Sequence, residues 1–263
     1  MLLFETHAHY DDEQYDGDRE ELLPLLHESG IAAIVNIACD EESNARAFAL
    51  AQRYPYVFAT VGYHPCDCGG LTDAHFDTMR ARAANEKVVA VGEIGLDYHW
   101  DDVPRAVQQE MFIRQLDLAR DMDLPVVIHS REAAQDTFDI LRGHGVGRGV
   151  MHCYAYSTEM AREYIKRGYM LGIGGVVTFK NAKTVKAVVE AIPLEHLVLE
   201  TDSPYLTPSP YRGKRNSSAH LIYVAEAIAK IKGTDVATVC EQTFENALRL
   251  YGLDRQRVCG ASI

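Results

Sequence analysis

The chain has 263 residues, of which 47% are hydrophobic, and carries a formal net charge of −12 at pH 7. This length and composition suit one large core, so we expect a single domain spanning residues 1–263. An acidic chain lacks the basic stripe typical of proteins that adhere broadly to nucleic acid or anionic lipid. A nucleic-acid substrate remains compatible with this charge, because bound divalent metals and a local basic loop can hold a phosphate.

The apolar runs of the sequence, such as 126–128 and 197–199, are far shorter than the roughly 18 residues of a membrane helix. We therefore predict no membrane span. Met1 to Phe4 lead directly into the acidic Glu5, without the basic region and longer apolar stretch of a secretory signal, which favours a cytoplasmic location. The six cysteines form no CxxC pair, and we expect reduced thiols. The sequence leaves the oligomeric state open.

Short β-rich runs alternate with longer amphipathic segments, a pattern typical of repeated βα units and a parallel sheet. Strands are predicted at about 2–6, 32–38, 57–62, 88–94, 125–129, 149–152, 169–173 and 197–201. Helices are predicted near 17–29, 42–54, 73–85, 105–122, 132–142, 157–167, 181–191 and 218–231, with an extra one near 235–250. The pattern predicts a single parallel (β/α)8 TIM barrel with an extra C-terminal helix packed on its outside.

Several histidines and acids fall at or just beyond the C-terminal ends of predicted strands. They are His7, His9, Glu93, His129, His152 and Asp202. In a closed barrel these ends meet at one mouth, so the residues would surround a single cavity. His7 and His9 are two positions apart, and in an extended segment both side chains point the same way. Four neutral imidazoles suit zinc, manganese, iron or nickel.

The acids in this set suggest distinct roles. Glu93 follows the apolar run 88–91, where a buried carboxylate is costly without a cation, and its two oxygens could bridge two ions. Asp202 follows the eighth strand and suits a group that touches a metal and takes a proton from water. Glu200 is a candidate for orienting a ligand. His64 is a candidate for contacting a substrate phosphate, with a loop-structuring role as the alternative.

Basic residues gather in the longest irregular segment, about 202–217, directly after the eighth strand. A loop of this length in a compact domain is usually functional. Arg212, Lys214 and Arg215, together with Arg131, are candidate phosphate contacts, because a guanidinium group matches phosphate oxygens. The alternatives are a salt bridge at a helix N-terminus for Arg131, and pairing with acids of the barrel for Lys214 or Arg215.

Taken together, these motifs resemble the TatD-type metal-dependent deoxyribonucleases, within the amidohydrolase-like barrel superfamily. The resemblance covers essentially the whole chain, through residues 5–9, 62–65, 92–98, 128–131, 152–153, 200–205 and 212–216. It implies two divalent metal ions, with Mg²⁺, Zn²⁺ and Mn²⁺ all open. The implied ligands are His7, His9 and Asp202 for one ion, His129 and His152 for the second, and Glu93 as the bridge. His64 and Glu200 match further active-site positions of the family.

The resemblance predicts a hydrolase that cleaves phosphodiester bonds of DNA by a metal-activated water, with RNA or tRNA as alternative nucleic-acid substrates. The same chemistry would suit a deacylase or amidohydrolase acting on a C–O or C–N bond, for example of aminoacyl-tRNA. Many amidases of the superfamily carry a modified lysine at the fourth strand, where this chain has Glu93, and that difference favours phosphoester chemistry. A barrel that keeps its metal ligands only as a structural staple is the non-enzymatic alternative.

Overall fold

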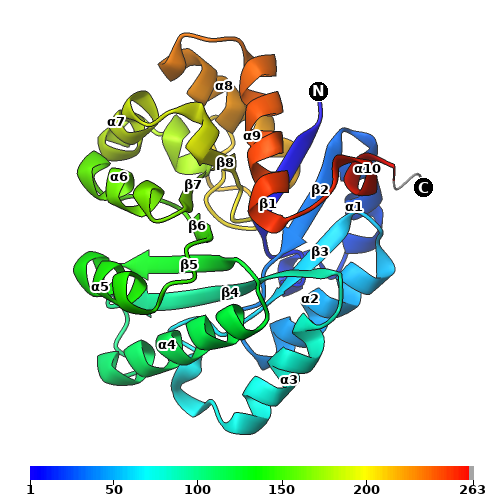
Figure 1. Cartoon of the computed structure of the whole chain (residues 1–263). Helices are drawn as coiled ribbons and strands as arrows, with labels where there is room; N and C mark the ends of the chain where they lie inside the picture. Colours follow the sequence, from blue (N-terminus) through cyan, green and yellow to red (C-terminus); the bar gives the residue numbers. More distant parts are fainter. Residues whose placement is uncertain (261–263) are drawn as a thin grey trace.

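The strands of the computed structural model, which describes residues 1–260, form one parallel sheet in the order β1 to β8. Helices lie around the outside of the strands (Figure 1). The strands are β1 (Leu3–Ala8), β2 (Ile31–Asn36), β3 (Val57–Val61), β4 (Val88–Asp97), β5 (Val126–Arg131), β6 (Gly149–Met151), β7 (Tyr169–Ile173) and β8 (Leu197–Leu199). Each lies at a predicted position, and the (β/α)8 barrel is confirmed. β4 runs three residues further than predicted, because residues 94–97 continue to pair with β5.

The helices follow the strands as predicted. They are α1 (Arg19–Glu28), α2 (Glu41–Arg53), α3 (Asp73–Ala83), α4 (Arg105–Asp121), α5 (Ala134–His144), α6 (Thr158–Lys166), α7 (Lys183–Ala191), α8 (Leu221–Lys232), α9 (Val236–Tyr251) and α10 (Arg255–Cys259). Short 3₁₀ helices are η1 (Glu13–Tyr15), η2 (Cys68–Gly70), η3 (Gly175–Thr178), η4 (Leu194–His196) and η5 (Ser218–His220). The short α10 was not predicted, since five residues are too few to show a helical period. Within residues 1–260, no helix is long and apolar enough to cross a membrane.

Backbone contacts between the first and last strands close the barrel. The amide of His9 donates to the carbonyl of Ser203 (2.7 Å), and the amide of Asp202 donates to the carbonyl of His7 (3.0 Å). Ala8 and Ser203 also form a parallel bridge. Closure therefore brings residues from the two ends of the chain to the same side of the mouth.

One cluster of buried side chains takes at least one residue from every strand, including Phe4 of β1 and Val127 of β5, and packs against the apolar face of α9. Phe244 and Tyr251 of α9 each lie 6.0 Å from Phe4, between ring centroids. Helix α9 packs against β1 and β8 beside α8, as an extra helix outside the strands, in agreement with the prediction.

Gly95 allows β4 and β5 to pair closely beside the mouth. It adopts φ +146°, a backbone conformation that residues with a Cβ rarely adopt. Gly95 is paired with His129 in the sheet, and a Cβ at this position would overlap the carbonyl oxygen of His129. Position 95 therefore requires glycine, because the backbone of His129, a candidate metal ligand, lies directly against it.

Candidate active site

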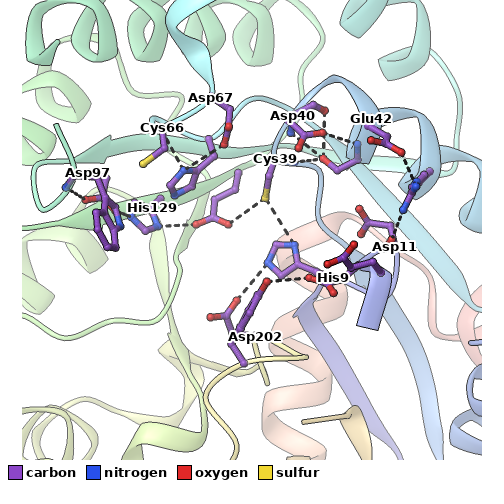
Figure 2. A pocket seen from close by; sticks show the side chains of 18 of the residues that line it. His9, Asp11, Cys39, Asp40, Glu42, Cys66, Asp67, Asp97, His129 and Asp202 are labelled. Atoms are coloured by element: carbon purple, nitrogen blue, oxygen red, sulfur yellow. Dashed lines mark hydrogen bonds and ion pairs between the residues drawn. The ribbon is translucent and has the colours of Figure 1, made fainter. Parts of the chain in front are cut away.

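The predicted metal ligands converge at the C-terminal ends of the strands, at a cleft of about 1100 Å³. His9, Glu93, His129 and Asp202 line this cleft, and His7 and His152 are buried beside them. Figure 2 shows His9 and Asp202 on one side of the hollow and His129 on another. Much of the remaining lining is acidic, including Asp11, Asp12, Asp16, Asp40, Glu42, Asp67, Asp97 and Asp102.

His7, His9 and Asp202 form one compact group. The Nε2 atoms of His7 and His9 lie 3.2 Å apart. Oδ1 of Asp202 lies 3.6 Å from Nε2 of His7 and 3.3 Å from Nε2 of His9. Ligands bonded to one tetrahedral ion at about 2.1 Å are about 3.4 Å from one another. The spacing of these three atoms therefore suits a single divalent ion.

Glu93 lies between the group formed by His7 and His9 and the group that contains His129, and its side chain is almost fully buried. Its Oε2 is 3.3 Å from Nε2 of His7, and its Oε1 is 2.7 Å from Nδ1 of His129. Burial favours the neutral acid, but His152 and His7 outweigh burial and hold the pKa of Glu93 well below its usual value. An ionised carboxylate thus turns one oxygen toward each group.

His152 is held by Glu200, which is 1% exposed. Oε2 of Glu200 lies 3.2 Å from Nδ1 of His152, and its Oε1 accepts the amide N–H of Cys153 (2.6 Å). Burial lowers the pKa of His152, but attraction to Glu200 and Glu93 raises it to about 10. Fixing Nδ1 leaves Nε2 directed at Glu93 and Asp202, 3.9 and 3.8 Å away, the arrangement by which carboxylates orient metal-binding histidines.

His129 is held in the same way by Asp97, a residue for which the sequence suggested no role. Oδ2 of Asp97 lies 3.0 Å from Nε2 of His129, while Nδ1 faces Glu93. The ring of His129 lies 6.5 Å from that of His152, measured between centroids, and that of His152 stacks on His7 at 3.5 Å. His152 thus lies closer to His7 than to His129, and its Nε2 is 3.9 Å from Oε1 of Glu93.

Cys39, which follows β2, is a second residue that the sequence interpretation missed. Its Sγ lies 3.7 Å from Nδ1 of His9 and 4.0 Å from Oε2 of Glu93. Burial raises the pKa of this thiol to about 12, so it is neutral. Cys39 and Asp97 both follow predicted strands. The other site residues were identified by this same position, so it could also have identified these two.

His64 lies at the rim of the same cleft, 4.4 Å from His129 between ring centroids. The backbone N–H of Cys66 donates to its Nδ1 (3.2 Å). Burial, together with the neighbouring His129, lowers the pKa of His64 to about 4, so the ring is neutral at pH 7. With Nδ1 accepting a hydrogen bond, the proton resides on Nε2, which makes His64 a hydrogen-bond donor rather than a metal ligand.

The predicted basic residues occupy different places. Arg131 is exposed and lines the main cleft, and within residues 1–260 it forms no ion pair. Arg212, Lys214 and Arg215 instead line a smaller cleft of about 380 Å³, which shares Tyr205 with the main one. Arg215 is paired with Asp18 through two hydrogen bonds and also donates to the carbonyl of Gln14 (2.6 Å). Arg215 therefore forms an ion pair with an acid, which was the predicted alternative to a phosphate contact.

The donor set fits divalent metal ions. Imidazole nitrogens and carboxylate oxygens approach one another closely in several overlapping groups, among them His7, His9 and Asp202, and His7, Glu93 and His152. The carboxyl groups of Glu93 and Asp202 are both held ionised despite burial, through neighbouring histidines. Such buried charge is offset when cations lie among the oxygens. A parallel barrel with this set of ligands at its mouth defines the class of metal-dependent hydrolases.

Comparison with known proteins specifies the family. The model of the family described as TatD related DNase matches residues 4–252, and the chain belongs to this family. It is 43% identical to YabD of Bacillus subtilis (strain 168), named an uncharacterized metal-dependent hydrolase, over 96% of this chain and 100% of that one. It is 32% identical to a protein of Cronobacter sakazakii named 3'-5' ssDNA/RNA exonuclease TatD, over 95% and 97% of the two chains.

The fold agrees with this assignment. The crystal structure of the TatD homologue YjjV from Escherichia coli K12 matches with a TM-score of 0.90 at 30% identity, over 96% of this chain and 98% of that one. A TatD-family hydrolase from Entamoeba histolytica has the same fold, with a TM-score of 0.86 at 21% identity over 95% and 98% of the two chains. The protein is a metal-dependent hydrolase of the TatD family.

Proposed function

We propose that this protein hydrolyses phosphodiester bonds of DNA, and of RNA as a second substrate, with two divalent metal ions. The observation that carries the proposal is the position of Glu93, whose two oxygens face two different histidine groups at 3.3 and 2.7 Å. Two-ion sites of this kind clamp both the attacking and the leaving oxygen of a phosphoryl group. The name of the Cronobacter sakazakii relative supports a nucleic-acid substrate.

We assign the ligands from this geometry. His7, His9 and Asp202 would hold one ion, His129 and His152 would take part in holding the second, and Glu93 would contribute to both. Glu200 and Asp97 are positioning residues, because each fixes one nitrogen of a histidine so that the other faces Glu93. Mg²⁺, Zn²⁺ and Mn²⁺ all remain candidates, although imidazole-rich sites favour Zn²⁺ and Mn²⁺ over Mg²⁺.

The ions would supply water of lowered pKa and would offset the charge on the phosphoryl oxygens. Asp202 would take the proton of the attacking water, because it lines the cleft and its Oδ1 faces His7 and His9. His64 donates its Nε2–H to a phosphate oxygen, because its Nδ1 already accepts from Cys66.

Arg131 is the proposed phosphate contact inside the main cleft, where most other charged lining residues are acidic. Arg212 and Lys214 are proposed to hold the nucleic-acid backbone beyond Tyr205, in the smaller cleft. Arg215 is proposed to hold this loop against α1 through Asp18, and it takes part in the phosphate site by fixing the loop.

Hydrolysis of defined oligonucleotides by the metal-loaded protein tests the proposal. We expect single-stranded DNA to be cleaved after Mn²⁺, Zn²⁺ or Mg²⁺ is restored to chelator-treated protein, and to remain intact without it. An aminoacyl-tRNA measured in parallel distinguishes ester deacylation from phosphodiester cleavage. Release of the amino acid without cleavage of any DNA or RNA by fully metal-loaded protein would overturn the proposal in favour of the deacylase alternative.

A further inference from the structure

Trp100, the single tryptophan of the chain, lies exposed in the main cleft. The residue is 52% exposed, although aromatic residues of this size are usually mostly buried. It lines the same cavity as His9, Glu93 and Asp202. None of the roles assigned above uses this ring.

The position of Trp100 relative to the metal site is fixed by Asp97. Oδ1 of Asp97 accepts the backbone N–H groups of His99 (2.9 Å) and Trp100 (3.4 Å), while its Oδ2 contacts Nε2 of His129 (3.0 Å). One carboxylate thus joins the loop that carries the aromatic ring to a candidate metal ligand. The backbone that carries the ring is therefore tied to the candidate metal site.

The surroundings of Trp100 combine an aromatic face with a cation. The ring of His99 packs edge-on against it at 4.8 Å and 84°. The guanidinium carbon of Arg131 lies 5.8 Å from its centroid. The other arginine in the cleft lining, Arg46, is paired with Glu42 (2.5 Å), whereas Arg131 has no ion pair within residues 1–260. An aromatic surface beside a free guanidinium suits a base and its phosphate.

Arg131 is the cation that distinguishes this end of an otherwise acidic cleft, whose lining beside Trp100 also includes Asp97 and Asp102. Figure 2 shows Asp97 and His129 at one end of the view and Asp11 and Glu42 at the other. Acidic side chains at both ends repel a nucleic-acid backbone unless cations cover them. At the Trp100 end, Arg131 offers the phosphate contact, and stacking is an attraction that acidic neighbours do not cancel.

We propose that Trp100, with Arg131 beside it, is the stacking platform for the base of the nucleotide that adjoins the scissile phosphate. This platform presupposes the proposed phosphodiesterase function. Its ligand class is a nucleoside monophosphate unit with any base, because every base presents a π face. It makes Trp100 a residue that determines preference for nucleotides over base-free phosphodiesters.

The first test uses the fluorescence of the single tryptophan in the metal-loaded wild-type protein. Thymidine 5'-monophosphate, which contains no phosphodiester bond, is expected to change the emission saturably, and deoxyribose 5-phosphate is expected to leave it unchanged. This measurement requires no variant and no hydrolysis. Equal responses to the two compounds, or no response to either, would overturn the platform.

The second test compares hydrolysis of a dithymidine dinucleotide and of its counterpart without bases. Trp100→Ala is expected to raise KM for the dinucleotide about tenfold with little change in kcat, and to leave the base-free substrate unaffected. Trp100→Phe retains an aromatic face and is expected to stay near wild type. Leu25→Ala is the control, because Leu25 is 59% exposed and lies on α1, outside the cleft lining.

The outcomes separate the two proposals. If the wild type cleaves both substrates and Trp100→Ala changes neither KM, the platform is wrong and the phosphodiesterase function stands. If thymidine 5'-monophosphate changes the fluorescence but no phosphodiester is cleaved, the ring binds bases and the proposed function fails. A folded Trp100→Ala variant that loses kcat on the base-free substrate as well would show a general structural role and overturn the platform.

Discussion

Replacing Gly95 by alanine is expected to weaken the fold and the metal site together. Gly95 lies in β4 with φ +146°, and it pairs with His129 of β5. An added methyl group would overlap the carbonyl oxygen of His129. Because backbone cannot rotate away as a flexible side chain can, the two strands must separate at the residue that carries a proposed ligand.

The expected loss in the free energy of unfolding has two parts. A residue with a Cβ held in such a conformation costs about 1–3 kcal/mol. Strand separation weakens the hydrogen bonds on either side of the pair, at about 1 kcal/mol each. We therefore expect Gly95→Ala to lower the free energy of unfolding by about 3–5 kcal/mol, a large part of the total of about 5–15 kcal/mol typical of a protein.

Urea unfolding followed by far-UV circular dichroism measures the stability, and metal analysis of the folded protein measures occupancy. Gly143→Ala is the matched control, because Gly143 lies within α5 with no atom near the added methyl group. There alanine should stabilise the protein by up to about 1 kcal/mol through helix propensity. A Gly95→Ala protein within 1 kcal/mol of wild type and with full metal content would refute this reasoning.

Three further predictions concern the proposed chemistry. Glu93→Gln should reduce the bound metal from two ions per chain to one or none and reduce turnover with it; full metal content in elemental analysis, with normal turnover, would remove Glu93 from the bridge. Asp202→Asn keeps the shape and one oxygen, so some metal should remain while turnover falls about a hundredfold or more, and an unchanged pH–rate profile would contradict its role as base. Arg212→Ala and Lys214→Ala should each flatten the dependence of log affinity on log salt by about 0.7–0.9, whereas Arg215→Ala should mainly lower stability, by up to about 1 kcal/mol; equal salt slopes in all three variants would count against a phosphate grip by this loop.

The sequence determined the barrel and the end of it at which the candidate metal ligands lie, because both depend on local patterns. Alternating apolar runs and amphipathic segments fixed the order of strands and helices, and the position of each acid or histidine after a strand placed it at the mouth. His7 and His9 needed only the two-residue period of a strand. Boundaries differed mainly where local pattern gives little information, as at the end of β4, which pairing with β5 prolongs.

Tertiary structure alone decided how these groups contact one another. Glu200 and His152 are 48 positions apart, and whether the carboxylate reaches Nδ1 depends on side-chain direction after the barrel closes. Arg215 and Asp18 are 197 positions apart, so their pairing has no local signal. The contact between Asp97 and His129, which joins the loop of Trp100 to this histidine, likewise has no local signal in the sequence. Periodicity reports which face a residue occupies, but the partner across a cavity is set by packing and closure of the whole sheet.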